Sequence, residues 1–478
     1  MSYLNRVLLY ELEDIVGEEN VTDKRADLDA VSTDVCSISR FWIDRGREPV
    51  TPDVIVSPRT ALQVSKVLQF ANTWKIPVTP RGGGAGDTCG ALPIFGGIVL
   101  DLGKMDRVLA IDEHNFTVTS ETGIYQADLE ETLAKKGYTL NFFPASHYCS
   151  TFGGFLANRG SGTLSSKYGK IEDLVISMEV VLPTGEITRT LPVRDHSTGP
   201  ELTKLFLGSE GTFGVITNAT LKMYPAPEER RFNAFLFKTL EDAIDAGRLI
   251  MVRRLGASVI RVYDEVDTRL AVKKVLGFER DGSFLVVGFD GYKEMVDFQE
   301  QRAFQIIREK GGEDMGREPG LNWWKNRFKF YYPPYNLEAQ PVIHGVFDTC
   351  ASFDNILKIF YAQKEAVEEG FKEWEVTYMG HFSHWYDYGT ILYPTFIVHK
   401  PPADADELLR LNHRIWNAGL KAALEHGGTV NEHHGVGLRL GRFMKENYGT
   451  GFVTLQRIKK ALDPNNIMNP GKMGFEGR

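Results

Sequence analysis

The sequence is poor in several features that would each point to a class of protein. Its 478 residues include only four cysteines, and none of them forms a Cys-x-x-Cys pair, which argues against an iron–sulfur cluster and a disulfide framework. No apolar run approaches the roughly 18 to 20 residues of a membrane helix. The net charge of −8 leaves no basic stripe for nucleic acid. We therefore expect a small-molecule ligand, no nucleic acid and no transmembrane segment.

Targeting signals are also lacking near the start of the chain. Residues 1–23 mix charged residues with Leu and Tyr in a helical rhythm, without the apolar core of a signal peptide. Together with the scattered cysteines, this predicts a cytoplasmic location. A chain of 478 residues is too long for one hydrophobic core, so we expect about two or three compact units.

Glycine, by contrast, is abundant, and it is densest in one loop between two apolar segments. The loop reads Pro80-Arg81-Gly82-Gly83-Gly84-Ala85-Gly86-Asp87-Thr88-Cys89-Gly90-Ala91. It has neither the Gly-Lys-Ser/Thr ending of a P-loop nor the spacing of a Rossmann turn. Without Cβ atoms, successive backbone N–H groups can converge on one point, so we interpret the loop as a phosphate cradle with Arg81 and Thr88 as polar partners. A mobile surface loop is the alternative interpretation.

Two more glycine-rich passages follow, at 144–162 and at 207–217. The first is long and nearly free of charge, and its backbone and hydroxyl donors suit a flat heteroaromatic ligand edged with carbonyl groups and ring nitrogens. Hydrophobic periodicity predicts a βαβ unit before the glycine loop, then paired strands over 108–119, a helix over 125–136 and a strand over 219–224. After a proline-containing linker at 225–231, strands over 232–236, 258–263 and 283–289 alternate with helices over 240–255 and 296–310, as in a ferredoxin-like sandwich.

The three glycine-rich passages, in this order and at this spacing, resemble the FAD-binding domain of the vanillyl-alcohol oxidase superfamily, also called the PCMH-type FAD domain. The resemblance implies that the first passage holds the FAD pyrophosphate, that the second lines the flavin, and that the third completes the adenosine side. The chain end at 457–472 matches the tail of the superfamily and would return to this domain. The implied FAD-binding residues are Pro80, Arg81, Gly82, Gly83, Gly84, Ala85, Gly86, Asp87, Thr88, Ala91, Pro144, Ser146, Thr151, Gly153, Gly154, Gly160, Ser161, Gly162, Glu210, Gly214, Val215, Ile216 and Asn469.

Many members of this superfamily attach FAD through a histidine in the first loop. This loop has no histidine, and Cys89 is its only nucleophile, so the resemblance implies non-covalent FAD. The expected fold class is α+β, with a two-subdomain PCMH-type FAD-binding domain and a ferredoxin-like α+β cap domain. We place the FAD-binding domain with its N-terminal helices at 1–225, the substrate-binding cap domain at 226–425, and a C-terminal segment that returns to the FAD-binding domain at 426–478.

A pair of histidines, His433 and His434, follows Glu432 in a loop before a Gly-x-Gly turn. Adjacent loop side chains point to opposite sides, so one histidine can face the flavin and accept the proton of a substrate hydroxyl. The loop resembles the Glu-His-Gly of FAD-dependent 2-hydroxy-acid dehydrogenases and the multi-histidine loop of alkyldihydroxyacetonephosphate synthases. A helix-capping loop with solvated histidines is the alternative.

The stretch 379–393 holds His381, His384, Tyr386 and Tyr388. In the 2-hydroxy-acid dehydrogenases this region reads Gly-His-x-Gly-Asp-Gly-Asn-x-His and supplies two metal-binding histidines, of which only His381 is matched here. The segment 383–389 is closer to the synthases, where a tyrosine that matches Tyr386 acts on the substrate. His381, His384 and Glu432, with His433, have the ligand types of a divalent metal site, but the family spacing is broken, so we regard a metal as the less favoured case.

Two arginines are candidate anion-binding residues. Arg327 follows Trp323 and Trp324, and three tyrosines come soon after it at 331, 332 and 335. In relatives the matching arginine grips a carboxylate or phosphate, for which a guanidinium fork is suited. Arg261 resembles a synthase position in the same way. The alternatives are a stacked surface residue for Arg327 and an ion pair with Asp264 for Arg261.

These motifs together favour an FAD-dependent dehydrogenase that transfers hydride from a small 2-hydroxy acid, of the D-lactate or glycolate type, to FAD. Two other enzymatic activities stay open: a redox-neutral synthase acting on dihydroxyacetone phosphate esters, and oxidation of an aromatic alcohol. A flavin-bearing subunit that only relays electrons is the non-enzymatic alternative. We expect a homo-oligomer, with an electron-transfer protein as a candidate partner. The candidate catalytic residues are His433, His434, Tyr386, Arg327, Arg261 and His384.

Overall fold

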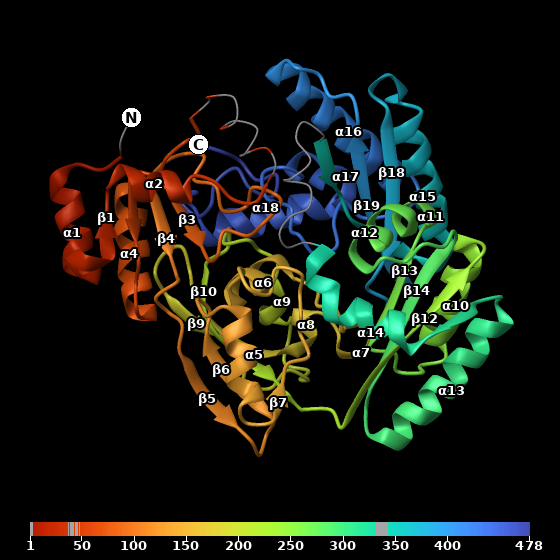
Figure 1. Cartoon of the computed structure of the whole chain (residues 1–478). Coiled ribbons are helices and arrows are strands. Elements are labelled where there is room, and N and C mark those ends of the chain that lie inside the picture. Colours follow the sequence, from red (N-terminus) through yellow and green to blue (C-terminus); the bar gives the residue numbers. More distant parts are fainter. Residues whose placement is uncertain (1–2, 37, 39–42, 44–45, 47, 331–342) are drawn as a thin grey trace.

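The computed structural model of the chain describes residues 3–36, 38, 43, 46, 48–330 and 343–478. Two smaller sheets from the first half of the chain and one large sheet from the second half are arranged around the centre of the molecule (Figure 1). Tyr331, Tyr332 and Tyr335, which we expected near Arg327, lie outside the described residues. No helix among the described residues is long and apolar enough to cross a membrane.

The first sheet carries the glycine loop at a strand end. Its order is β1-β2-β4-β3, with β2, β4 and β3 parallel and β1 antiparallel; the bounds are β1 Val21–Thr22, β2 Val54–Val56, β3 Val78–Arg81 and β4 Ile98–Asp101. Helix α4 (Ala61–Trp74) joins β2 to β3 and begins where the Thr60 hydroxyl accepts from the Gln63 N–H. Helices α1 (Arg6–Val16) and α2 (Arg25–Val31) precede this unit. The predicted βαβ unit is confirmed, and the loop leaves β3 at the carboxyl end of the parallel strands, where open sheets bind ligands.

The second sheet is antiparallel and carries the other two glycine-rich passages. Its order is β5-β6-β10-β8-β9, with bounds β5 Val108–Asp112, β6 Thr117–Glu121, β8 Val175–Val181, β9 Ile187–Arg189 and β10 Val215–Lys222. Four helices share a hydrophobic core with it: α5 (Gln126–Ala134), α6 (Phe152–Asn158), α8 (Ile171–Leu174) and α9 (Leu202–Phe206). The short α7 (Ser165–Tyr168) and the two-stranded pair of β7 (Tyr138–Thr139) and β11 (Tyr224–Pro225) complete this region.

The third sheet has eight strands, which come from two consecutive parts of the chain. In the first half, β12 (Glu229–Phe237), β13 (Val259–Tyr263), β14 (Ser283–Gly291) and β15 (Glu313–Gly316) lie in the spatial order β15-β12-β14-β13, which is the ferredoxin-like arrangement that we predicted. In the second half, β18 (Val376–Phe382), β19 (Gly389–Val398) and β16 (Ile343–Val346) continue the sheet, and β17 (Thr349–Ser352) pairs with β19. The halves join where β13 pairs with β18, at Val262↔Phe382 and Tyr263↔His381.

The two faces of this sheet have different coverings. Helices α10 (Leu240–Val252), α13 (Lys293–Glu309), α15 (Phe353–Glu368) and α16 (Ala405–Glu425) lie on the outer face (Figure 1) and share a core with strand residues such as Val262 and Phe382. Because side chains alternate along a strand, Arg261, Tyr263 and His381 belong to the other face. Short elements lie nearby, namely α11 (Glu265–Asp267), the π-helical turn Thr268–Val272, α12 (Lys273–Leu276) and α14 (Arg317–Asn326).

The C-terminal residues return to the first sheet. After α17 (Met444–Tyr448) and α18 (Gly451–Leu462), Met468 forms a bridge to Val78, and the Asn469 N–H donates to the Val78 carbonyl at 2.8 Å. The buried Lys459 ammonium reaches the Thr212 carbonyl at 3.0 Å. The end of the chain is therefore joined to both N-terminal sheets.

Two predicted boundaries are wrong for the same reason, namely pairing with distant strands. Strand β10 begins at Val215 rather than at 219, because Val215 and Ile216 pair with β8. Strand β12 begins at Glu229, inside the predicted linker, because residues 229–231 pair with residues 289–291 of β14. The prolines at 225 and 227 therefore end one strand, but the charged residues after them are already part of the next.

Candidate functional site

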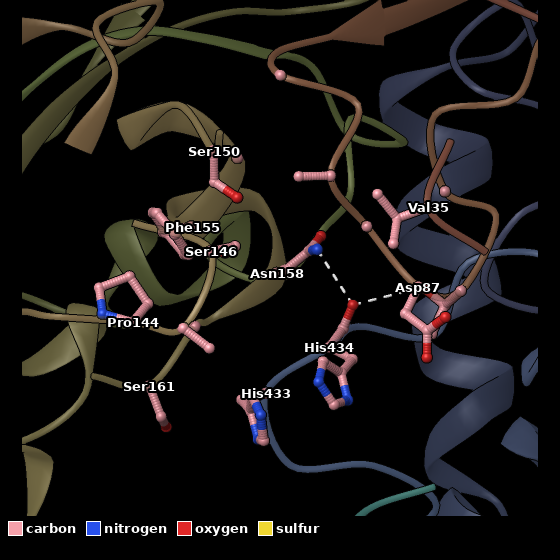
Figure 2. A pocket seen from close by; sticks show the side chains of 18 of the residues that line it. Val35, Asp87, Pro144, Ser146, Ser150, Phe155, Asn158, Ser161, His433 and His434 are labelled. Atoms are coloured by element: carbon pink, nitrogen blue, oxygen red, sulfur yellow. Dashed lines mark hydrogen bonds between the residues drawn. The ribbon is translucent and has the colours of Figure 1, made fainter. Parts of the chain in front are cut away.

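A cavity of about 690 Å³ lies where the three sheets meet. Residues from each of the three glycine-rich passages line it. Figure 2 shows part of this lining, with Asp87 of the first passage and Ser161 of the second near His433 and His434. All of the residues expected to bind FAD line this cavity except Gly162 and Asn469. Of the candidate catalytic residues, the cavity is lined by His433, His434, Arg327, Arg261 and His384. Tyr386 is not among the lining residues and lies behind them, against Glu432.

The glycine loop lies directly on the second passage, at a distance that only glycine permits. A Cβ atom at Gly82 would be 2.2 Å from Thr151 Oγ1, and one at Gly83 would be 2.0 Å from the Cys149 carbonyl oxygen. No described residue accepts a hydrogen bond from the backbone N–H groups of residues 82–87. A cluster of such donors at the carboxyl end of a strand fits the diphosphate of FAD.

The side chains of Arg81 and Thr88 contact protein carbonyl groups. The Arg81 guanidinium donates to Val31, Thr33 and Ala91 carbonyl oxygens at 3.2, 2.9 and 3.5 Å. The Thr88 hydroxyl donates to the His434 carbonyl at 3.4 Å. Both side chains therefore hold neighbouring backbone in place, and their expected role as phosphate partners stays a prediction.

Gly162 and Asn469 have structural contacts instead of a place in the cavity wall. A Cβ atom at Gly162 would lie 2.9 Å from the Phe143 backbone nitrogen, so the glycine allows two backbone segments to touch. Asn469 Nδ2 donates to the carbonyl groups of Gly90 at 3.0 Å and Glu210 at 2.8 Å. It thereby joins the first passage to the third, as well as joining both to the C-terminal segment.

All three passages hold the backbone of the histidine loop. Thr88 from the first and Asn158 from the second both donate to the His434 carbonyl oxygen, the latter at 3.1 Å (Figure 2). Glu210 from the third accepts from the N–H groups of Val436 and Gly437 at 2.5 and 2.7 Å. Burial raises the pKa of Glu210 to about 7, against these hydrogen bonds, which lower it. The three contacts fix the two imidazoles at the cavity wall.

Asp348 is a functional residue that sequence reasoning missed. Its fully buried carboxylate accepts from His434 Nδ1 at 2.7 Å, from Asn431 Nδ2 at 2.7 Å, and from the backbone N–H groups of Glu432 and His433 at 2.6 and 3.1 Å. Burial lowers the pKa of His434, but the charge of Asp348 and its hydrogen bond outweigh this and raise it to about 9. Burial raises the pKa of Asp348, and the two histidines outweigh that, so the value falls to about 2. In the sequence, Asp348 is marked only as a single acidic residue after the apolar pair Val346 and Phe347.

Glu432 stands at the centre of a second buried group. Its carboxylate accepts from His433 Nδ1 at 2.7 Å, from Ser161 Oγ at 2.9 Å and from the Tyr386 hydroxyl, and Lys170 Nζ lies 2.8 Å away. Burial raises the pKa of Glu432, but Lys170 and His433 hold it well below its usual range. Lys170 could not be singled out from the sequence, because it lies 262 positions before Glu432.

The histidines expected to bind a metal are divided between two places. His384 lies near Glu432 and His433, with potential ligand atoms within 4.8 Å of one another, and its Nδ1 is 2.7 Å from Ser165 Oγ. Asp348, His433 and His434 form a second such group. His381 is in neither of these groups of described residues, so its expected place beside His384 and Glu432 is corrected.

His381 instead contacts Arg261 across the joint between β13 and β18. Arg261 Nη2 is 2.6 Å from His381 Nε2, and His381 Nδ1 is 3.2 Å from Asp267 Oδ2. Burial and the charge of Arg261 lower the pKa of His381 well below its usual range, while burial raises the pKa of Asp267 to about 7. Tyr393 stacks on His381 at 4.7 Å between ring centroids and on His433 at 5.8 Å, which links this group to the histidine loop.

Arg327 lies among aromatic rings on the cavity wall. Its Cζ atom is 3.6 Å from the ring centroid of Trp324 and 4.2 Å from that of Phe328, and Nη1 donates to the Trp324 carbonyl at 2.7 Å. Burial lowers its pKa to about 10, so the guanidinium is still charged at neutral pH. A charged fork of donors at the edge of an apolar cavity can bind a carboxylate or phosphate.

Two family models match the chain. Residues 52–191 match the FAD binding domain, and residues 226–473 match the C-terminal domain of FAD linked oxidases. The alkyldihydroxyacetonephosphate synthase of Trypanosoma brucei brucei is 31% identical over 470 residues, which cover 92% of this chain and 75% of that protein. The mitochondrial D-lactate dehydrogenase (cytochrome) of Arabidopsis thaliana is 32% identical over 431 residues, which cover 88% of this chain and 73% of that protein.

Solved structures agree with these matches. A structure of alkyldihydroxyacetonephosphate synthase has a TM-score of 0.83 at 26% identity and covers 98% of this chain and 86% of that one. A structure of p-cresol methylhydroxylase with bound substrate has a TM-score of 0.80 at 17% identity, covers 98% of this chain and 96% of that one, and shows the fold alone. The chain is thus an enzyme of the FAD-linked oxidase family, with the PCMH-type fold and FAD as its cofactor.

Proposed function

We propose that the protein is a dehydrogenase that oxidises the CH–OH carbon of a small 2-hydroxy acid, of the D-lactate or glycolate type. The observation that carries this proposal is one cavity wall with a proton acceptor and an anion-binding group, namely His433 held by Glu432 and the buried cation Arg327. Oxidation of an alcohol requires a group that takes the hydroxyl proton and a group that holds the substrate. When bound, FAD supplies the hydride acceptor.

His433 rather than His434 is the proposed base. Glu432 is hydrogen-bonded to His433 Nδ1, which leaves Nε2 of this ring as the nitrogen proposed to take the substrate proton. His434, with its pKa near 9, is doubly protonated at neutral pH and cannot accept another proton. Its fixed positive charge instead lies next to the glycine loop, where it favours the anionic cofactor.

The remaining residues bind and orient. Arg327 is proposed to hold the substrate carboxylate, with Arg261 as a second cation in the cavity lining. Tyr386 is proposed to act through Glu432, because its hydroxyl donates to that carboxylate from behind the cavity wall. The protein thus moves one proton, from the substrate hydroxyl to His433 Nε2, while a carboxylate bound at Arg327 keeps the CH–OH carbon in place.

Anaerobic mixing with D-lactate, glycolate and aromatic alcohols tests the proposal. We expect D-lactate or glycolate to bleach the oxidised-flavin absorbance, and His433→Ala to slow bleaching by about 10²-fold or more. His434→Gln, which removes a charge but no proposed base, should alter FAD affinity more than the bleaching rate. Bleaching at the wild-type rate in His433→Ala would remove this histidine from the mechanism, and bleaching by aromatic alcohols alone would identify the other substrate class.

The synthase activity is a second candidate, supported by the synthase of Trypanosoma brucei brucei and by the synthase structure. The residues His384 and Tyr386 also come from a segment that resembles those enzymes. Glu432 weighs against the synthase activity, because a multi-histidine loop would have a histidine at this position. In this structure the Glu432 carboxylate is contacted by four donors. Exchange of an acyl for an alkyl group on a dihydroxyacetone phosphate ester, without bleaching, would favour this candidate.

A further inference from the structure

A buried lysine lies beside the carboxylate that a metal ion would be expected to use. Lys170 precedes helix α8, and its Nζ atom is 2.8 Å from Glu432 Oε1 and 2.6 Å from the Glu432 carbonyl oxygen. The two side chains are only 11% and 2% exposed. Lysine is almost never buried this deeply without a counter-charge. Lys170 and Glu432 therefore form a buried ion pair that is part of the site.

The Glu432 carboxylate has donors on both oxygens. Oε1 is bonded by Lys170 Nζ, by Ser161 Oγ at 2.9 Å and by the Tyr386 hydroxyl, and Oε2 is bonded by His433 Nδ1 at 2.7 Å. An ionised carboxylate offers about four acceptor positions. Three of these donors therefore share Oε1 and one takes Oε2, so a metal ion would have to bind Oε2 beside His433 and close to the Lys170 ammonium.

The other potential ligands are engaged in a similar way. Asp348, the acid of the second group, accepts from two backbone N–H groups and from the side chains of Asn431 and His434. His384 is bonded to Ser165 through Nδ1 only, and both ring nitrogens of His381 contact other side chains. A divalent ion at His384 and Glu432 would lie beside the Lys170 ammonium, and this repulsion is the reason that the residues present do not fit the divalent metal that the histidine pattern of this family suggests.

We propose that the ammonium group of Lys170 replaces a divalent metal ion in this cluster and positions Glu432, and through it His433, for a metal-independent reaction. The Lys170 ammonium is the counter-charge of the buried carboxylate, and Glu432 in turn orients the His433 ring through its contact with Nδ1. Neither Lys170 nor Glu432 is among the residues that line the cavity, so the lysine is a positioning residue and not a Lewis acid toward the substrate.

Lys167 provides a matched control. It lies three positions earlier in α7, and its Nζ atom is 2.9 Å from Asp290 Oδ1, a carboxylate that is fully buried. This pair is also a lysine with a buried acid, but neither residue lines the cavity or contacts the histidine loop. Lys167→Met should therefore show what the loss of a buried ion pair does to stability alone.

The test combines metal binding with variants of the holoenzyme. Mn²⁺ is titrated into the wild-type protein, and free Mn²⁺ is followed by its EPR signal; we expect no stoichiometric binding and no loss of flavin reduction after EDTA treatment. Lys170→Met should slow flavin reduction by about 10- to 100-fold, Lys170→Arg should recover part of the rate, and Lys167→Met should reduce its flavin at the wild-type rate with a lower unfolding temperature.

Stoichiometric Mn²⁺ in the wild type, inactivation by EDTA, or a wild-type rate in Lys170→Met would each overturn the inference. If Lys170→Met does not retain FAD, the Mn²⁺ titration of the wild type and the flavin-reduction rate of Lys170→Arg still test the inference. The kinetic arm rests on the proposed function, whereas the Mn²⁺ arm does not. A wild-type flavin that no hydroxy acid reduces, in a protein that binds no Mn²⁺, would refute the proposed function and the positioning role of Lys170 in it, and would leave only the absence of a metal at this cluster supported.

Discussion

Asp348 distinguishes two adjacent histidines by the hydrogen bond that it accepts from one of them. It pairs with His434 at 2.7 Å and raises the pKa of that imidazole to about 9, whereas His433 is hydrogen-bonded to Glu432. Neighbours in the sequence, with the same side chain, thus acquire different chemistry from the acids that contact them. The distinction depends on two carboxylates from separate parts of the chain, 86 positions and one position away from their histidines.

We expect the Asp348–His434 pair to make stability depend on pH. The folded pKa of His434 is above its ordinary value of 6.5, so its contribution is complete below pH 6.5 and is lost as pH rises through about 9. The folded pKa of Asp348 is below 3.8, so its contribution is complete above that pH and is lost as pH falls through about 2. The shared contribution at neutral pH is on the order of 3 kcal/mol.

Asp348→Asn tests this through the unfolding temperature measured between pH 7 and about 10. The wild type should lose stability over this range as His434 deprotonates, and the variant should be less stable at pH 7 with a flatter profile. Asp297→Asn is the control, because Asp297 is a 45% exposed acid paired with Lys293 far from the cavity. Parallel profiles for wild type and Asp348→Asn would contradict the assigned pair.

Among the elements, the glycine-rich passages could be predicted because their information is local. A loop with many glycines after a buried strand has few physical uses, and the three passages do line one cavity. The contacts of individual side chains were not predictable in this way. Lys170 meets Glu432 across 262 positions, and Arg261 meets His381 across 120, so only the assembled sheets bring them together. Arg81 is an example of a side chain whose residue type suggested a phosphate partner. In the structure its guanidinium donates to nearby carbonyl groups.

The contact between the first two passages makes a specific prediction about the glycine loop. A Cβ atom at Gly83 would lie 2.0 Å from the Cys149 carbonyl oxygen, whereas one at Gly86 would meet nothing within 4 Å. The alanine methyl group in Gly83→Ala must therefore push the glycine loop away from the backbone at Cys149, which should lower the free energy of unfolding by about 1–3 kcal/mol. We expect it to lower both the unfolding temperature of the apoprotein and the FAD content of the purified protein.

Gly86→Ala is the matched control in the same loop, because its apoprotein should unfold at the wild-type temperature. Only the apoprotein values are compared here, since Gly86 also lines the cavity and a methyl group could touch the cofactor directly. An equal loss of apoprotein stability in both variants would mean that the close approach of Gly83 to Cys149 does not constrain the loop.

In the molecule as a whole, three separately built sheets surround the centre (Figure 1), and residues from all three parts of the chain line the cavity. Its walls are held together by a few contacts that each cross between sheets: Thr88 and Asn158 to the His434 carbonyl, Glu210 to the N–H groups of residues 436 and 437, and Asn469 to both N-terminal sheets. A cofactor that fills this cavity would touch every wall. FAD is therefore expected to stabilise the whole chain and not one sheet alone.

This expectation can be measured by the release and return of FAD. The glycine loop has no histidine, and its Cys89 is buried and does not line the cavity, so we expect acid precipitation to leave the flavin in the supernatant. Apoprotein prepared more gently should unfold in one lower transition, and free FAD at about 100 times its dissociation constant should restore about 2.7 kcal/mol. If hydrogen exchange showed that FAD increases amide protection in only one part of the chain, the three sheets would not be coupled through the cofactor. Flavin that stays with the pellet would contradict non-covalent binding and direct attention to Cys149, the cysteine that does line the cavity.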